Sequence, residues 1–107
     1  MNVLTREEIL MALSDLPGNR WQLSCMQEGG SLSLSCQLRF SGFEQAFAFM
    51  TQVALIAARL DHHPDWSNVF DRVAISLSTH DAGGVTDKDL QLARSIEAVL
   101  QLYLPNG

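Results

Sequence analysis

The chain has 107 residues, of which 47% are hydrophobic and 18% charged, and its formal net charge is −5. This length predicts one domain, residues 1–107, with a single core. The seven Lys and Arg residues are scattered along an acidic chain, which argues against direct nucleic-acid binding, since that normally needs a basic patch. No stretch approaches the ~20 apolar residues of a membrane span, and Met1 to Leu10 lacks the pattern of a signal peptide.

Three segments carry the pattern of a capping box, in which a Ser or Thr caps a helix and an acid three residues later reaches back to it. They are Thr5-x-x-Glu8, Ser41-x-x-Glu44 and Thr86-x-x-Asp89. Apolar residues at helical spacing follow each pattern. The predicted helices run over about Thr5 to Leu16, Phe43 to Leu60 and Asp87 to Leu104.

Between these helices the apolar residues alternate. Leu32 to Phe40 alternates without a break, which predicts a strand with one buried face. Trp21 to Gln27, followed by the turn signal Glu28-Gly29-Gly30, predicts its hairpin partner, and Asn68 to Phe70 with Val73 to Thr79 predicts a second hairpin around Asp71-Arg72. The order α-β-β-α-β-β-α predicts an α+β fold, a four-stranded antiparallel sheet with helices packed on one face.

The middle helix is apolar on more than one side. Phe49, Leu55 and Ile56 lie off its main apolar stripe, so a second side could face another subunit, or Phe49 and Ile56 could simply widen one buried face. Both interpretations remain open at this stage. The stripe expected to face the core consists of Phe43, Ala46, Phe47, Met50, Val53, Ala54, Ala57 and Leu60.

The two cysteines, Cys25 and Cys36, have no metal-ligand spacing and fall on the two strands of the first predicted hairpin. A disulfide between them is geometrically conceivable. Two reduced, half-buried thiols in a cytoplasmic protein are the preferred interpretation.

All three histidines lie in Asp61-His62-His63-Pro64-Asp65-Trp66 and Ser78-Thr79-His80-Asp81. Adjacent histidines point in different directions on any regular element, so the pair suits a loop, and Pro64 pins its backbone. Imidazole exchanges protons near neutral pH, and Trp66 offers a flat wall, although a Trp is more often part of a core. The stretch predicts a site that moves protons on a flat ligand.

Two chemistries compete for these residues. The three histidines with Asp61 or Asp81 could hold zinc, but adjacent histidines rarely chelate one ion and no His-x-His or His-Glu-x-x-His spacing is present. Acid-base catalysis needs one group to give a proton and another to accept one, which two or three histidines beside carboxylates can do. The residues favour acid-base catalysis without metal or cofactor, and Asp89 either orients a histidine or only caps the last helix.

Three pieces of the chain, Phe47 to Thr51, Leu60 to Phe70 and Leu77 to Gly84, together with Asp89, closely resemble the pterin-4a-carbinolamine dehydratases. The resemblance runs from about Leu38 to Leu100 and is weaker before it. It implies dehydration of a 4a-hydroxytetrahydropterin to quinonoid dihydropterin, which recycles the pterin cofactor of aromatic amino acid hydroxylases, with no metal.

The resemblance also implies roles for single residues. His62, His63 and His80 would be catalytic, with His63 and His80 favoured for proton transfer. Asp89 would orient a histidine, with Pro64 in the same supporting layer. The pocket would be lined by Asp61, His62, His63, Trp66, Ser78, Thr79, His80 and Asp81.

A different class of function comes from the same family. Some members act as dimerisation cofactors of a homeodomain transcription factor, binding the protein and not the DNA, and the family typically forms tetramers through helix packing. The resemblance therefore implies a homo-oligomer, dimer or tetramer, and leaves open a role as a protein-binding assembly partner. The intact histidine set favours an enzyme, because a pure scaffold would not require it.

Overall fold

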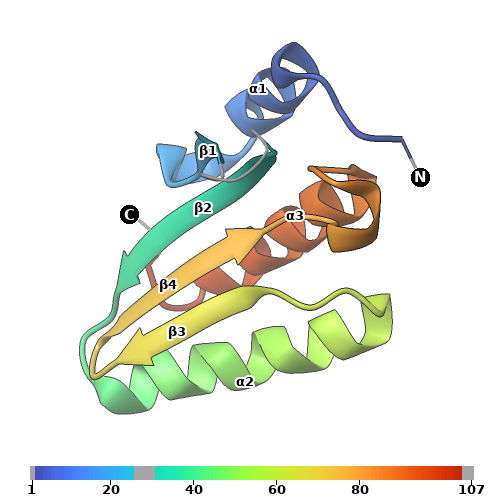
Figure 1. Cartoon of the computed structure of the whole chain (residues 1–107). Helices are drawn as coiled ribbons and strands as arrows, with labels where there is room; N and C mark the ends of the chain where they lie inside the picture. Colours follow the sequence, from blue (N-terminus) through green and yellow to red (C-terminus); the bar gives the residue numbers. More distant parts are fainter. Residues whose placement is uncertain (1, 26–30, 105–107) are drawn as a thin grey trace.

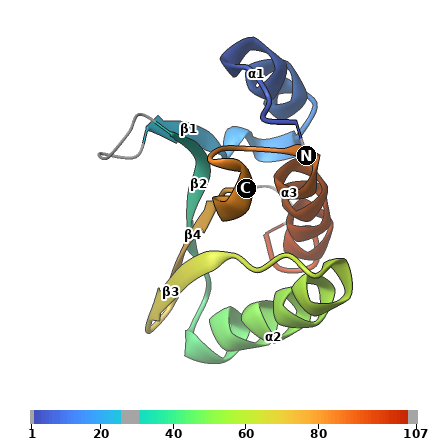
Figure 2. The same ribbon diagram turned by 45° about the vertical axis from the view of Figure 1, so that its right-hand side comes forward.

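A computed structural model of the chain describes residues 2–25 and 31–104. This part contains three α-helices and a four-stranded antiparallel sheet of order β1-β2-β4-β3, with the helices on one face (Figures 1 and 2). The predicted order and fold class are confirmed. The elements are α1 Arg6–Ser14, β1 Gln22–Cys25, β2 Leu32–Arg39, α2 Phe43–Leu60, β3 Asp65–Val69, β4 Arg72–Leu77 and α3 Asp87–Leu100, with 3-10 turns at Pro17–Asn19 and His80–Ala82.

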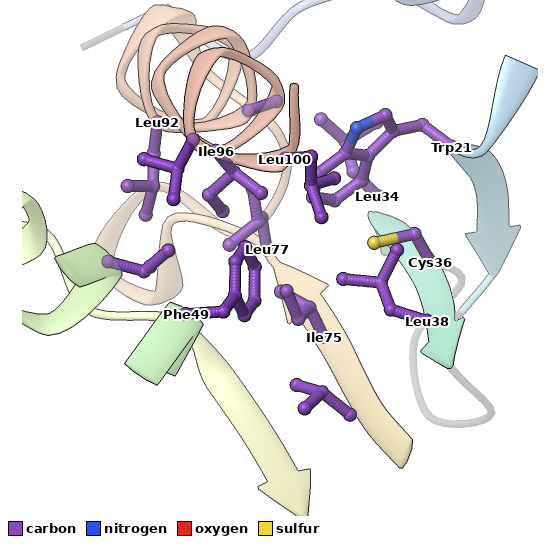
Figure 3. Close-up of a cluster of buried hydrophobic side chains, with 14 of the residues drawn as sticks. Trp21, Leu34, Cys36, Leu38, Phe49, Ile75, Leu77, Leu92, Ile96 and Leu100 are labelled. Atoms are coloured by element: carbon purple, nitrogen blue, oxygen red, sulfur yellow. The ribbon is translucent and has the colours of Figure 1, made fainter. Parts of the chain in front are cut away.

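The core lies between the sheet and the helices α2 and α3 (Figure 3). The alternation in β2 is confirmed, because its apolar face is buried and pairs residue by residue with the apolar face of β4. Burying each large side chain contributes about 1.5–3 kcal/mol. The cross-strand partners are Leu34 with Leu77, Cys36 with Ile75 and Leu38 with Val73, and α3 packs Leu92, Ile96 and Leu100 above them.

The expected core stripe of α2 is partly wrong. Phe49, expected off the stripe, is fully buried. Three residues expected on the stripe are exposed: Phe43 (46%), Phe47 (56%) and Ala54. Leu55, expected off the stripe, is 62% exposed. A helix that is apolar on several sides has no unique inward face in its sequence, so packing against the sheet decides which side turns in. The buried face consists of Ala46, Phe49, Val53 and Ala57. Within the described residues no helix is long and apolar enough to cross a membrane.

Two of the three predicted capping boxes are confirmed. Thr5 and Glu8 bond reciprocally at the start of α1, and Thr86 and Asp89 do so at the start of α3. The box at Ser41 is wrong, because the N-cap of α2 is Gly42 and no side chain caps that end. The Ser41 amide instead donates to Gln45 Oε1 at 3.3 Å.

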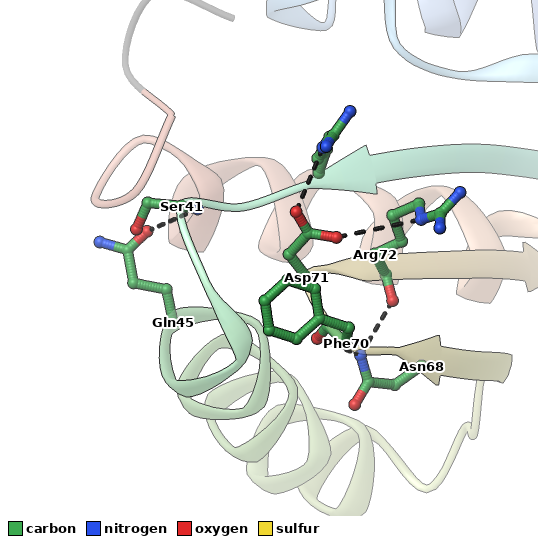
Figure 4. A network of polar contacts seen from close by, with 7 residues as sticks. Ser41, Gln45, Asn68, Phe70, Asp71 and Arg72 are labelled. Atoms are coloured by element: carbon green, nitrogen blue, oxygen red, sulfur yellow. Dashed lines mark hydrogen bonds and ion pairs between the residues drawn. The ribbon is translucent and has the colours of Figure 1, made fainter.

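The second hairpin is longer than predicted. Strand β3 begins at Asp65, not at Asn68, and the turn lies one residue earlier than expected, with Phe70 in the left-handed region at φ 53°. Figure 4 shows the reason: Asn68 Nδ2 donates to the carbonyl oxygens of Phe70 and Arg72 and closes the turn, while the Asp71 carboxylate faces Arg72. Side-chain bonds therefore fix a turn whose position the apolar pattern alone does not reveal.

The register keeps the two cysteines apart. Cys25 lies opposite Leu32 and is exposed, while Cys36 is buried on the core face of β2. This register excludes a disulfide between the two residues. Both thiols were expected to be half-buried, but one is exposed and the other is buried. Burial, together with the nearby Glu97 carboxylate and against the opposing effect of Arg20, raises the pKa of the Cys36 thiol from 9.0 to about 12.

Alkaline pH is expected to destabilise the fold through Cys36. Between about pH 9 and pH 12 the unfolded thiol ionises while the folded one stays protonated, so the folded state binds more protons and stability falls as pH rises. The free energy of unfolding should fall by up to ~1.4 kcal/mol per pH unit from this group alone, and below about pH 9 it contributes no slope. Urea unfolding at three pH values in that window measures it. Equal slopes for the wild type and Cys36→Ala would contradict it.

Candidate active site

The first half of the site follows the end of α2. Asp61 adopts a left-handed conformation, φ 52° and ψ 44°, that ends the helix. The His62 amide then donates to the Ala57 carbonyl at 3.0 Å, which ties the next residue back to the last turn. The histidine pair therefore lies in a short connection between α2 and β3, as the sequence predicted, and its entry is fixed by backbone hydrogen bonds.

The second half of the site follows the end of β4. The chain continues through Ser78 and Thr79 into the 3-10 turn His80–Ala82. The Thr79 amide donates to the Gly84 carbonyl at 2.7 Å, and Gly83, at φ 79°, lets the chain turn back. His80 therefore lies just past the strand, on a tight turn leading to α3.

The two halves line one cleft. Its volume is about 310 Å³, within the usual range for pockets that hold small ligands. All three histidines of the chain contribute to it. The lining residues are Asp61, His62, His63, Ser78, Thr79, His80, Asp81 and Lys88.

Asp89 is fully buried beside two residues of the cleft lining, His62 and Thr79. Its Oδ1 is 2.5 Å from His62 Nε2, while its Oδ2 accepts from the Thr79 hydroxyl at 2.8 Å and from the Thr86 amide at 2.9 Å. An ionised carboxylate only accepts hydrogen bonds, so it fixes the His62 proton on Nε2. Asp89 therefore caps α3 and orients a histidine at the same time, which joins the two roles that the sequence offered as alternatives.

The other two imidazoles differ from His62. His63 and His80 are exposed, and neither ring makes a hydrogen bond within residues 2–25 and 31–104. Their ring nitrogens remain available to a ligand in the cleft. His62 has only its Nδ1 atom available to a ligand, because its Nε2 atom faces Asp89.

Not every expected residue reaches the cleft. Trp66 lies on β3, half-buried against the core, and is absent from the cleft lining. Conversely, Lys88 lines the cleft although sequence reasoning missed it. Its place beside Asp89 in the first turn of a predicted helix was the available signal, but a surface lysine there has no distinguishing pattern.

Two further observations bear on ligand chemistry. A larger hollow of about 420 Å³ lies on the open sheet face around Arg39 and Arg72, but it contains no histidine, so the smaller cleft has the proton-transfer chemistry. In the described ranges, no group of three or more His, Cys, Asp or Glu side chains is arranged to hold a metal ion.

Comparisons with known proteins give matches over most of the chain. The family model "Pterin 4 alpha carbinolamine dehydratase" matches residues 2–99. A pterin-4-alpha-carbinolamine dehydratase from Synechococcus sp. (strain WH7803) is 54% identical over 79 residues, 74% of this chain and 78% of that protein. A protein of the same name from Burkholderia orbicola (strain MC0-3) is 47% identical over 94 residues, 88% of this chain and 86% of that one.

Two solved structures are similar in fold. A transcriptional coactivator/pterin dehydratase from Brucella melitensis has a TM-score of 0.81 at 41% identity, covering 92% of this chain and 98% of that one. A pterin dehydratase-like protein identified as a RuBisCO assembly factor in the α-carboxysome has a TM-score of 0.62 at 18% identity, covering 75% of this chain and 88% of that one. The second likeness shows the fold alone.

Proposed function

The chain belongs to the pterin-4a-carbinolamine dehydratase family and is a dehydratase, and from this premise we propose that its histidine cleft dehydrates a 4a-hydroxytetrahydropterin by acid-base catalysis without metal or cofactor. The observation that carries the proposal is the convergence of all three histidines on one cleft, with one of them held by a buried carboxylate. The product, quinonoid dihydropterin, is the form that a reductase returns to the cofactor pool of aromatic amino acid hydroxylases.

The reaction balances as two proton transfers. A general acid protonates the 4a-hydroxyl, the C4a–O bond breaks, and water leaves. A general base takes the proton of the neighbouring ring nitrogen, and the electron pair of that N–H bond forms the new C4a=N double bond. One proton is given and one is taken, so the pair of catalytic groups exchanges its protonation states without a net change.

His63 and His80 are the residues assigned to these transfers, because their rings are exposed to the cleft and make no protein hydrogen bond among the described residues. His62 holds or assists the substrate through Nδ1, since Asp89 occupies Nε2. Asp61, Ser78 and Asp81 line the same cleft and are assigned to binding, and Trp66 keeps its proposed role as a wall only if the bound ligand extends beyond the lining described above.

The test is the conversion of enzymatically generated 4a-hydroxytetrahydropterin, followed by ultraviolet absorbance with chelator-treated protein. Rapid conversion should survive chelation, and His80→Ala should lose at least ~10²-fold in rate, the usual size of a general acid-base contribution. The exposed, uninvolved change Asp87→Asn controls for handling and charge. Loss of activity on chelation would reject the metal-free mechanism, and no acceleration over buffer would reject the dehydratase assignment for this chain.

We also propose that the chain forms a homo-oligomer through α2. Phe43, Phe47 and Leu55 are exposed on this helix, and the rings of Phe43 and Phe47 lie 5.8 Å apart, which makes an apolar surface typical of a subunit contact. Light scattering that gives a monomer mass at every concentration would contradict this. A protein partner of the coactivator kind remains the alternative occupant, and pull-down with this surface intact and with Phe47→Glu tests it.

A cytoplasmic location is part of the same proposal. Two cysteines in 107 residues are fewer than small, disulfide-dense secreted domains carry. Fractionation of cells that express the native chain tests the location.

A further inference from the structure

Thr79 was expected to contact the substrate, but its side chain is otherwise engaged. The residue is 5% exposed, and its hydroxyl donates to Asp89 Oδ2 at 2.8 Å. A hydroxyl has one proton to give, and here that proton is donated to the Asp89 carboxylate, so it is not available to a ligand. The side chain therefore acts on the carboxylate that holds His62.

The hydrogen bonds around Thr79 have a defined direction. Its oxygen is 2.7 Å from Thr86 Oγ1, and because the Thr79 proton is committed to Asp89, Thr86 must be the donor of that pair. The Thr86 oxygen in turn accepts from the Lys88 amide at 3.3 Å. The result is a connected set of hydrogen bonds between the first turn of α3 and the buried carboxylate, in which the bonds polarise one another.

The backbone of Thr79 belongs to the other half of the site. Its carbonyl accepts from the amides of Ala82 and Gly83 at 3.1 and 3.0 Å, and its amide donates to Gly84 at 2.7 Å. These bonds close the 3-10 turn that begins at His80. Thr79 thus holds the His80 turn through its backbone, and through its side chain it holds Asp89, the partner of His62.

From this arrangement, and resting on the function proposed above, we propose that Thr79 is a positioning residue that keeps the His62 and His80 halves of the cleft in register, with Thr86 as its hydroxyl donor. Asp89 uses Oδ1 for His62 and Oδ2 for Thr79 and the Thr86 amide. Removal of the Thr79 hydroxyl leaves the Thr86 amide as the one remaining donor to Asp89 Oδ2. The carboxylate then gains freedom to turn, and both its orientation and the His62 ring lose definition.

The variants that test this are Thr79→Val, which keeps the shape and removes the hydroxyl, and Thr79→Ser, which keeps the hydroxyl. Partners that orient a functional histidine typically contribute 10- to 100-fold. Thr79→Val should therefore lower kcat by roughly 10- to 100-fold with KM changed less than about 3-fold, and Thr79→Ser should restore kcat to within about 3-fold of the wild type. Thermal unfolding is measured alongside, so that loss of folded protein is not counted as loss of kcat.

The second readout is independent of activity. Nitrogen-15 spectra of the imidazoles should show His62 with its proton on Nε2 in the wild type and in Thr79→Ser, and a mixture of ring states in Thr79→Val. A Thr79→Val protein with a lower melting temperature but unchanged kcat and His62 spectrum would overturn the proposal, as would a Thr79→Ser protein as slow as Thr79→Val.

Folding of the valine variant is not essential to the test. In the wild type the Thr79 hydroxyl proton should exchange slowly and show a nuclear Overhauser contact to the Thr86 hydroxyl proton. Absence of this slowly exchanging hydroxyl signal would also overturn the proposal. Failure of the dehydratase assignment is distinguishable from failure of this proposal. In that case the wild type would show no activity, but its His62 and hydroxyl spectra would still be those predicted for the Thr79 arrangement.

Discussion

We expect Asp89→Asn to lower kcat by about 10²- to 10⁴-fold, since an amide that imposes the wrong tautomer on a catalytic imidazole can cost up to ~10⁴-fold. The end of the side chain that faces the Thr86 amide and the Thr79 hydroxyl must be the oxygen, because an NH₂ group there would meet two donors. The NH₂ group then faces His62 Nε2, which can no longer keep its proton. The proton moves to Nδ1, so the nitrogen that does not face Asp89 can no longer accept a hydrogen bond from a ligand.

Asp87→Asn is the matched control for this variant. Asp87 is exposed and lies in the same first turn of α3, so both changes remove one negative charge from the same helix end. The helix-end charge alone is worth about 0.3–1 kcal/mol of stability and should leave kcat unchanged. Ultraviolet assays give kcat, and nitrogen-15 spectra give the His62 tautomer. Equal kcat values for Asp87→Asn and Asp89→Asn would show that Asp89 serves only as a cap.

Glu97→Ala should be the most destabilising of the proposed changes. The Glu97 carboxylate is buried on α3 and receives Arg20 Nε and Nη2 at 3.2 and 3.3 Å and Trp21 Nε1 at 3.0 Å. It therefore ties the segment leading into β1 to the last helix. Removing one partner of a buried ion pair leaves the other charge without compensation and typically costs 3–5 kcal/mol. Urea unfolding measures this loss.

Two comparisons distinguish the buried pair from a general effect of charge. Glu44→Ala removes an exposed carboxylate from the first turn of α2 and should cost at most about 1 kcal/mol. The double change Arg20→Met with Glu97→Leu should recover most of the stability, because a hydrophobic replacement of both partners leaves no buried charge. A double variant as unstable as Glu97→Ala would mean that lost packing or the unpaired Trp21 N–H, and not the unpaired Arg20, causes the effect.

Local patterns were sufficient for the type and order of the elements, although not for every boundary. The alternation from Leu32 to Phe40 identified β2 and its buried face, and the bounds of α2 were predicted at Phe43 and Leu60 as they occur. These predictions succeeded because a strand with one wet face and a helix with clear ends express their periodicity within a few residues. The histidine motifs likewise placed the connection after α2 and the turn after β4 in the site.

Tertiary structure decided which side of an element turns inward and which distant groups meet. Phe49 and not Phe43 or Phe47 entered the core, because α2 is apolar on several sides and only its contact with the sheet selects one of them. Thr79 was directed to Asp89, and Lys88 reached the cleft, through the packing of α3 against the end of β4. By itself, the sequence determined the element types, the fold class and most of the residues that line the cleft, since these depend on local spacing and residue type. The direction of each side chain depended on contacts between residues far apart in the chain.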